Sequence, residues 1–219
     1  MSAPLRVVVL ISGAGSNLQA LIDAQEREGY RVVGVISNRP AAAGLDRARV
    51  AGIPALTIDH TAFADRPAFE TALGAAIERL APDLIVLAGF MRVLTVDFVA
   101  RFTGRMLNVH PSLLPAYRGL DTHARALAAG ERWHGCSIHY VTAELDGGPV
   151  VLQARLAVQP GDTAQSLQAQ VQALEHVIYP QAVGWIAQGR LCWQNHGPWL
   201  DNIPLHQPAL LEALEVCPS

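Results

Sequence analysis

The sequence places an amide and an imidazole two positions apart, at Asn108 and His110. Because side chains alternate along an extended strand, these two point the same way. An amide N–H can stabilise the negative oxygen that develops during acyl transfer, and an imidazole can carry a proton near neutral pH. The pair therefore indicates acyl-transfer chemistry. The alternative is a capping Asn beside a structural His, in a chain that has eight histidines.

Asp146 is the candidate third group, in the segment LDGGP at 145–149. A carboxylate before two glycines is typical of a turn, and the local sequence favours that interpretation. The residue matters chemically only if the fold brings it to His110. There a carboxylate would orient the ring and favour its charged form.

The other histidines and the cysteines give weaker signals. His123 and His139 are interpreted as structural and His134 as a solvated loop residue. No spacing of His, Cys and carboxylates indicates a closed metal site. The odd number and wide spacing of the cysteines predict incidental thiols in a reducing compartment rather than disulfides. The three are Cys136, Cys192 and Cys217.

The loop Gly13-Ala14-Gly15-Ser16-Asn17 is a candidate anion site. Glycines permit positive φ angles, so amide N–H groups can converge on an anion at the start of the helix that follows. The loop lacks the third glycine of a dinucleotide fingerprint and the lysine of a P-loop. It therefore suits a single phosphate, the alternative being a tight strand-to-helix turn with an N-cap.

The elements that must position these groups alternate through residues 1–100. Buried apolar runs and helical periodicities follow one another in the order of βαβ units. Right-handed connections then predict a Rossmann-like open, mostly parallel sheet flanked by helices, with ligands beyond the carboxyl ends of the strands. The expected strands are Leu5–Ser12, Arg31–Ser37, Ala55–Ile58 and Leu84–Ala88, and the expected helices follow residue 17 and span Leu45–Ala51 and Phe69–Leu80.

Residues 101–219 have a different pattern, which predicts an antiparallel C-terminal extension of the same sheet. Asp162 or Thr163 should cap a long helix, which Pro180 should kink or end. The chain is expected to be a single α/β domain, 1–219, with an N-terminal phosphate-binding half (about 1–100) and a catalytic half (about 101–219). The expected elements are strands Met106–His110, Ser137–Val141 and Val150–Val158 and a helix Asp121–Ala129.

Composition excludes several function classes. The net charge is −3 and Lys and Arg are scattered, which argues against nucleic acid as a partner. No apolar run approaches the roughly 20 residues of a membrane span. The expected protein is cytoplasmic and contacts no membrane.

Five motifs occur together in one order: SGAGSN at 12–17, VLAGFMRVL at 86–94, NVHPSLLP at 108–115, ELDGGPV at 144–150 and EHVIYP at 175–180. In these the chain resembles the phosphoribosylglycinamide formyltransferases, also called glycinamide ribonucleotide transformylases, from about Val7 to Trp199. NVHPSLLP and LDGGPV are typical of folate-dependent formyltransferases in general, and SGAGSN and EHVIYP narrow the resemblance to this branch. The resemblance implies the formyltransferase fold.

The resemblance also implies roles for individual residues. Asn108, His110 and Asp146 match the catalytic trio. The positions that match ribonucleotide contacts are Gly15, Ser16, Asn17, Gln172 and Glu175. Those that match folate contacts are Arg66, Met91, Arg92, Val93, Leu94, Asn108, Thr142, Ala143, Glu144, Leu145 and Asp146. One departure is Asp121, where some members carry His, and no role is transferred to it.

The implied reaction moves the formyl group of 10-formyltetrahydrofolate, a co-substrate, to the amine of glycinamide ribonucleotide in de novo purine biosynthesis. It requires no metal, its partners are these two small molecules, and a homodimer is left open. The first alternative is a formyltetrahydrofolate hydrolase or a methionyl-tRNA formyltransferase, whose additional domains the length is expected to leave no room for. The second is a non-catalytic nucleotide- or folate-binding module. A dinucleotide-dependent dehydrogenase is disfavoured by the missing glycine.

Overall fold

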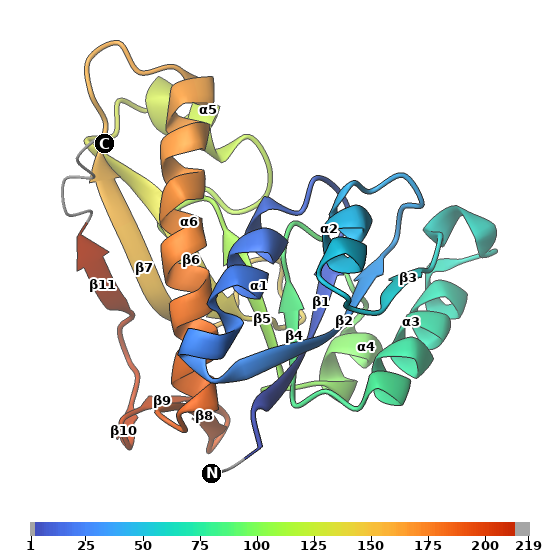
Figure 1. The fold of residues 1–219 in the computed structure, drawn as a ribbon. Coiled ribbons are helices and arrows are strands. Elements are labelled where there is room, and N and C mark those ends of the chain that lie inside the picture. The colour runs from blue at the N-terminus through green and yellow to red at the C-terminus, as the bar shows by residue number, and fades with distance from the viewer. Residues whose placement is uncertain (1–2, 213–219) are drawn as a thin grey trace.

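A computed structural model describes residues 3–212 of the chain. An eight-stranded sheet in the order β11-β7-β6-β5-β4-β1-β2-β3 forms the centre of the molecule (Figure 1). Its strands are β1 (Leu5–Ile11), β2 (Tyr30–Ser37), β3 (Ala55–Thr57), β4 (Leu84–Leu87), β5 (Met106–His110), β6 (Trp133–Tyr140), β7 (Val150–Ala157) and β11 (Ala209–Glu212).

Helices cover both faces of the sheet. A separate three-stranded sheet follows the last helix in the sequence. The helices are α1 (Ser16–Glu28), α2 (Gly44–Val50), α3 (Arg66–Leu80), α4 (Val96–Arg101), α5 (Thr122–Ala128) and α6 (Ala164–Ala187), with the 3-10 turn η1 (His60–Ala62). The small sheet contains β8 (Leu191–Gln194), β9 (Gly197–Leu200) and β10 (Ile203–Pro204).

The topology confirms the predicted fold class. Strands β3, β2, β1, β4 and β5 are parallel neighbours, in the order of a Rossmann-like half, and β6 then pairs antiparallel with β5. One sheet thus takes strands from both halves of the sequence, as expected. The division of function between the halves stays a prediction.

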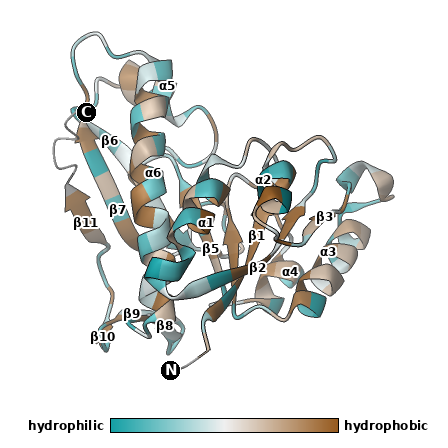
Figure 2. Ribbon diagram, in the orientation of Figure 1, coloured by the Kyte–Doolittle hydropathy of each residue, from teal (hydrophilic) through white to brown (hydrophobic). Residues whose placement is uncertain are grey.

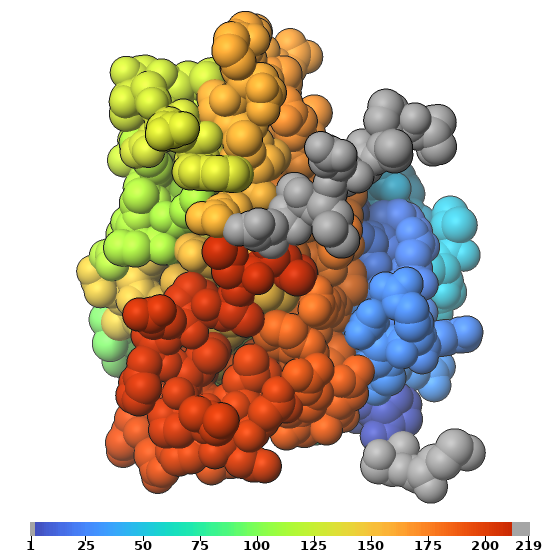
Figure 3. Space-filling model, turned by 90° about the vertical axis from the view of Figure 1, so that its left-hand side faces the viewer, coloured from blue at the N-terminus to red at the C-terminus, as the bar shows by residue number. Residues whose placement is uncertain are grey.

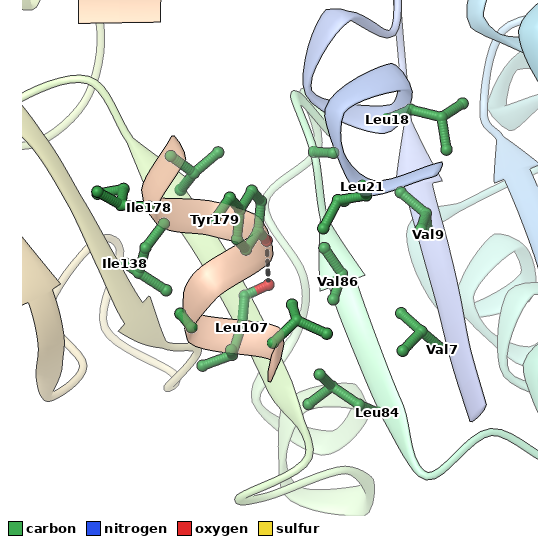
Figure 4. Packing of buried hydrophobic residues seen from close by; sticks show 14 of the residues in the cluster. Val7, Val9, Leu18, Leu21, Leu84, Val86, Leu107, Ile138, Ile178 and Tyr179 are labelled. Carbon is green, nitrogen blue, oxygen red and sulfur yellow. Dashed lines mark hydrogen bonds between the residues drawn. The ribbon is translucent and has the colours of Figure 1, made fainter. Parts of the chain in front are cut away.

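Alternation along β5 separates core side chains from polar ones. Leu107 and Val109 lie in the large apolar cluster on the side of α1 and α6, so Asn108 and His110 face the opposite side of the sheet. On the α6 side, the Tyr179 hydroxyl donates to Leu107 O at 3.0 Å, the dashed bond in Figure 4, and also to Leu87 O at 2.9 Å. The apolar side therefore anchors β5 to both β4 and α6.

The opposite face has a smaller apolar cluster beneath α3 and α4. Phe69 and Leu73 of α3 and Phe98 of α4 pack there against Val8 and Leu10 of β1. This arrangement makes β1 apolar on both faces, as the continuous hydrophobic colour of that strand shows (Figure 2).

Pro180 does not end helix α6, which was one of the two outcomes predicted for it. The Thr163–Ser166 capping box confirms the predicted start, but the helix continues past Pro180 to Ala187. A proline inside a helix costs about 3 kcal/mol. Burial of the neighbouring side chains Tyr179 and Ala182 offsets that cost and keeps the last turns helical.

The region after α6 was foreseen only as an antiparallel extension. The strands β8, β9 and β10 do pair antiparallel, whereas β11 pairs parallel with β7 at the sheet edge. In the space-filling view this segment, in red, lies against α6, in orange (Figure 3). Across residues 3–212, no helix has the length and apolar character that crossing a membrane requires.

Candidate functional site

The amide, the imidazole and the carboxylate of the predicted trio meet on the polar side of β5. The Asp146 carboxylate Oδ2 lies 3.4 Å from His110 Nδ1, and both side chains are at least nine-tenths buried. Asn108 belongs to the same strand face, two residues from His110. The structure therefore brings together three groups that are distant in the sequence.

The segment Asp146-Gly147-Gly148 places the Asp146 carboxylate beside His110. Asp146 has a left-handed backbone, φ 48°, and Gly119 N donates a hydrogen bond to its Oδ2 at 3.0 Å. A Cβ on Gly148 would lie 1.8 Å from Tyr140 O, so only glycine lets the returning chain approach β6 so closely. The segment is a turn, as the local sequence suggested, and it also places the acid beside the imidazole.

The surroundings of His110 fix where its proton can move. Its Nε2 lies 2.9 Å from Tyr117 O, a carbonyl that can only accept, so Nε2 carries a hydrogen. The nitrogen that gains or loses a proton is therefore Nδ1, which faces Asp146. At this distance the carboxylate can orient the ring and stabilise a positive charge on it.

His139 is a member of the cluster that sequence reasoning missed. It pairs directly with Asn108 across β5 and β6, and Asn108 Nδ2 lies 3.1 Å from its Nε2. Burial lowers the pKa of His139. The signal was available in the alternation of β6, where Cys136 and Ile138 enter the apolar cluster and His139 must face the other way.

The predicted ribonucleotide residues also come together, from α1 and α6. Gly15 caps α1 with φ 73°, and a Cβ there would lie 2.7 Å from Gly44 Cα. Gln172 of α6 donates a hydrogen bond from Nε2 to the Oγ of Ser16, the first residue of α1, at 2.9 Å. Asn17 Nδ2 donates to Glu175 Oε2 at 2.7 Å. The start of α1 and the middle of α6 thus form one polar surface.

Several features of this surface suit a ligand that carries both hydrogen-bond donors and an anionic group. Glu175 is buried, and burial raises the pKa of its carboxyl group. Among the described residues, Asn17 Oδ1 is a buried acceptor without a hydrogen-bond partner. A hollow of about 450 Å³ opens beside Ser16 and is lined by Arg47 and His176 among others. Arg47 Nε donates to Ala14 O at 2.9 Å, so a cation lies against the glycine loop.

The predicted folate segments border the smaller apolar cluster. Leu94 is buried in that cluster and Val141 packs against it, while Met91 and Val93 are exposed. Met91 N donates to Ser12 Oγ at 2.8 Å, which ties the first segment to the end of β1. The predicted segments are 91–94 and 142–146. They comprise Met91, Arg92, Val93 and Leu94, and Thr142, Ala143, Glu144, Leu145 and Asp146.

Two contacts attach neighbouring elements to these segments. Buried Glu70 of α3 accepts from Thr95 N at 2.9 Å, directly after the first folate segment. Exposed Arg66 begins the same helix, one turn earlier. Arg118, in the loop that follows β5, forms an ion pair with Glu144 of the second segment.

The prediction for His134 was wrong. This residue is buried within β6, and its Nε2 lies 3.0 Å from His123 Nδ1. Burial lowers the pKa of His134 to about 4. Strand β6 begins at Trp133, so His134 is the second residue of a strand and not part of a loop.

Other predicted features have simple outcomes. Asp121 is exposed and precedes α5 with φ 57°, without a side-chain capping bond. Cys136 is a buried free thiol and Cys192 a half-buried one, and Cys217 lies outside the described residues. Within residues 3–212 no group of His, Cys, Asp and Glu could hold a metal ion.

This fold and cluster define a class of enzyme that transfers small acyl groups, and comparison with known proteins agrees. The sequence pattern of the formyl transferase family matches residues 5–183. The chain belongs to the formyl transferase family.

Two relatives illustrate the sequence similarity. The chain is 51% identical over 200 residues to the phosphoribosylglycinamide formyltransferase of Escherichia coli, covering 90% of this chain and 94% of that protein. It is 42% identical over 198 residues to the human trifunctional purine biosynthetic protein adenosine-3, covering 86% of this chain and 20% of the longer protein.

Solved structures agree with the sequence relatives. The phosphoribosylglycinamide formyltransferase of Coxiella burnetii is 52% identical with a TM-score of 0.91, and the match covers 95% of this chain and 99% of that one. Glycinamide ribonucleotide transformylase 1 of Symbiobacterium toebii is 43% identical with a TM-score of 0.87, covering 91% and 95% of the two chains.

Proposed function

We propose that this protein transfers the formyl group of 10-formyltetrahydrofolate to the primary amine of glycinamide ribonucleotide, a step of de novo purine biosynthesis. The observation that carries the proposal is the buried approach of His110 to Asp146 on the strand face that holds Asn108. The names of the relatives given above point to the glycinamide acceptor, and the resemblance to the folate-dependent formyltransferases supplies the formyl donor.

In the proposed mechanism the neutral amine attacks the formyl carbon directly. Asn108 donates an N–H to the developing oxyanion, and the imidazolium of His110 stabilises the same charge. Asp146 holds the ring and supports its positive charge. The C–N bond to the folate then breaks as a proton passes, through water, from the attacking nitrogen to the departing one.

Positioning is expected to contribute more than any single catalytic group. Holding two substrates in reactive geometry can supply about 7–11 kcal/mol, whereas one oxyanion donor supplies about 3 kcal/mol. The ribonucleotide would place its phosphate at Gly15, Ser16 and Asn17, with its sugar and glycinamide end near Gln172 and Glu175. The orphan acceptor Asn17 Oδ1 and the buried Glu175 are suited to the N–H and O–H donors of that end.

The folate is assigned to the segments 91–94 and 142–146 and to Arg66. Their exposed apolar side chains, Met91 and Val93, can cover a pterin ring, and their backbone groups can pair with its polar edge. The cytoplasmic location stays a prediction, and the homodimer stays open.

A single assay separates this function from its alternatives. Purified protein is mixed with 10-formyltetrahydrofolate, with and without glycinamide ribonucleotide, and the folate absorbance is followed. Release of tetrahydrofolate only when the ribonucleotide is present, together with formylated product, is the expected result. Release without any acceptor would indicate a hydrolase, and binding without turnover a non-catalytic module.

A further inference from the structure

The strand β6 presents one buried imidazole to the cluster, and nothing in the mechanism above uses it. His139 is 2% exposed and lies opposite Asn108 in the antiparallel register of β5 and β6. A buried polar side chain normally has all its hydrogen-bonding groups paired, so the partners of both ring nitrogens define its state.

The first nitrogen is fixed by the backbone. His139 Nδ1 lies 3.0 Å from Tyr140 O, and a carbonyl oxygen can only accept a hydrogen bond. Nδ1 therefore carries the hydrogen. In a neutral ring this leaves Nε2 as an acceptor, and burial, which lowers the pKa of His139, favours the neutral ring.

The second nitrogen then fixes the amide of Asn108. His139 Nε2 lies 3.1 Å from Asn108 Nδ2, so Nε2 accepts one of the two amide hydrogens. The rotated amide would bring its carbonyl oxygen against the lone pair of Nε2, which is repulsive. The carboxylate of Asp146 does not compete for this position, because its Oδ1 is 3.8 Å from Nε2, beyond hydrogen-bond distance.

From this geometry we propose that His139 is a positioning residue, whose neutral Nδ1–H form orients the Asn108 amide so that its second N–H, rather than its carbonyl oxygen, is available to the oxyanion. The inference rests on the proposed function, which assigns the oxyanion to Asn108. A backbone carbonyl thus controls, through one imidazole, which end of the amide faces the substrate.

The kinetic test uses two substitutions of His139. His139→Leu removes the acceptor at similar volume, and His139→Gln retains an acceptor near the position of Nε2. We expect the Leu variant to lose about 10²-fold in kcat, the cost of one oxyanion donor. Its KM for each substrate should change little, because the lost contact acts in the transition state. The Gln variant should recover at least a tenth of the wild-type kcat.

A double-mutant cycle separates positioning from a general structural role. If His139 acts through Asn108, adding His139→Leu to Asn108→Ala should lower kcat by less than about threefold, because the two losses are one and the same. Independent, multiplying losses would overturn the proposal. His134→Gln is the matched control, since it alters a buried histidine on the other face of β6, and its kcat should stay within about fivefold of wild type.

A spectroscopic test needs no turnover. Nitrogen-15 spectra of histidine-labelled protein, with the His139 signals assigned by their loss in His139→Gln, should show a neutral ring with its hydrogen on Nδ1 at pH 7. An imidazolium ion, or hydrogen on Nε2, would overturn the proposal even if the Leu variant failed to fold. Absence of formyl transfer by the wild type would instead refute the proposed function and leave this result standing.

Discussion

The two faces of β5 carry opposite kinds of side chain. On one face Leu107 and Val109 lie in the large apolar cluster with residues of α6, where Tyr179 donates a hydrogen bond to the strand backbone. On the other face Asn108 contacts His139 of β6, and His110 contacts Tyr117 and Asp146, which come from two separate loops. The apolar face holds the strand in place, and the polar face depends on that placement to perform chemistry. Substitutions on the two faces should therefore separate stability from catalysis.

The largest effect is expected at Asp146. Asp146→Asn keeps the shape of the side chain but cannot stabilise an imidazolium ion on His110, so kcat should fall about 10³-fold. The melting temperature should change little by comparison. Steady-state kinetics and thermal unfolding measure the two quantities, and a kcat within tenfold of wild type would contradict the assignment.

Leu107→Ala tests the opposite face of the same strand. Loss of this fully buried side chain should lower the free energy of unfolding by about 2–5 kcal/mol, from lost burial and the cavity left behind. Denaturant titration measures the loss. The kcat per folded molecule should stay near that of wild type, and a kcat loss as large as that of Asp146→Asn would remove the distinction between the faces.

Glu175→Gln addresses the ribonucleotide surface. Because hydrogen bonds to a charged group contribute about 1.5–3 kcal/mol, the KM for glycinamide ribonucleotide should rise about 10- to 100-fold, with the folate KM unchanged. A raised pKa in the folded state means that stability is lost as pH rises above the unfolded value of 4.5. Near pH 7 the Gln variant should therefore be at least as stable as wild type, and a clear loss of stability would contradict this account.

The smallest effect is expected for His134, the buried histidine on the α6 side of β6. Its folded pKa of about 4 lies below the unfolded value of 6.5. As pH falls, His134 is protonated in the unfolded chain before it is protonated in the folded protein. The free energy of unfolding therefore decreases between pH 6.5 and pH 4. Between pH 7.5 and pH 5, the free energy of unfolding measured by denaturant titration should fall less for His134→Gln than for wild type. Equal losses would show that His134 is not the group responsible.

The elements with strong periodicity could be predicted from the sequence. The parallel strands have continuous apolar runs, and the capping residues around Thr163 mark the start of α6, so both were placed correctly. Elements without a distinct hydrophobic periodicity were not predicted from the sequence. Helix α4 has only six residues, and β11 is defined by its pairing with β7 rather than by its pattern.

The sequence predicted which residues form the candidate site better than it predicted the contacts between them. Asn108 and His110 could be paired from alternation alone, because they share one strand. The contribution of Asp146 depends on a close approach of Gly148 to Tyr140, which no local pattern reveals. His139 and His134 lie on opposite faces of the same strand, which alternation reveals once the strand is located, but their partners Asn108 and His123 follow only from the register of β6 against β5 and the position of α5.

The most direct test of the central claim is the kcat of His110→Ala with both substrates saturating. The account predicts a kcat at least about 10²-fold below wild type, with a measurable remainder because substrate positioning survives. A variant that kept the full wild-type kcat, with both substrates bound normally, would contradict the role of the buried imidazole and with it the proposed mechanism.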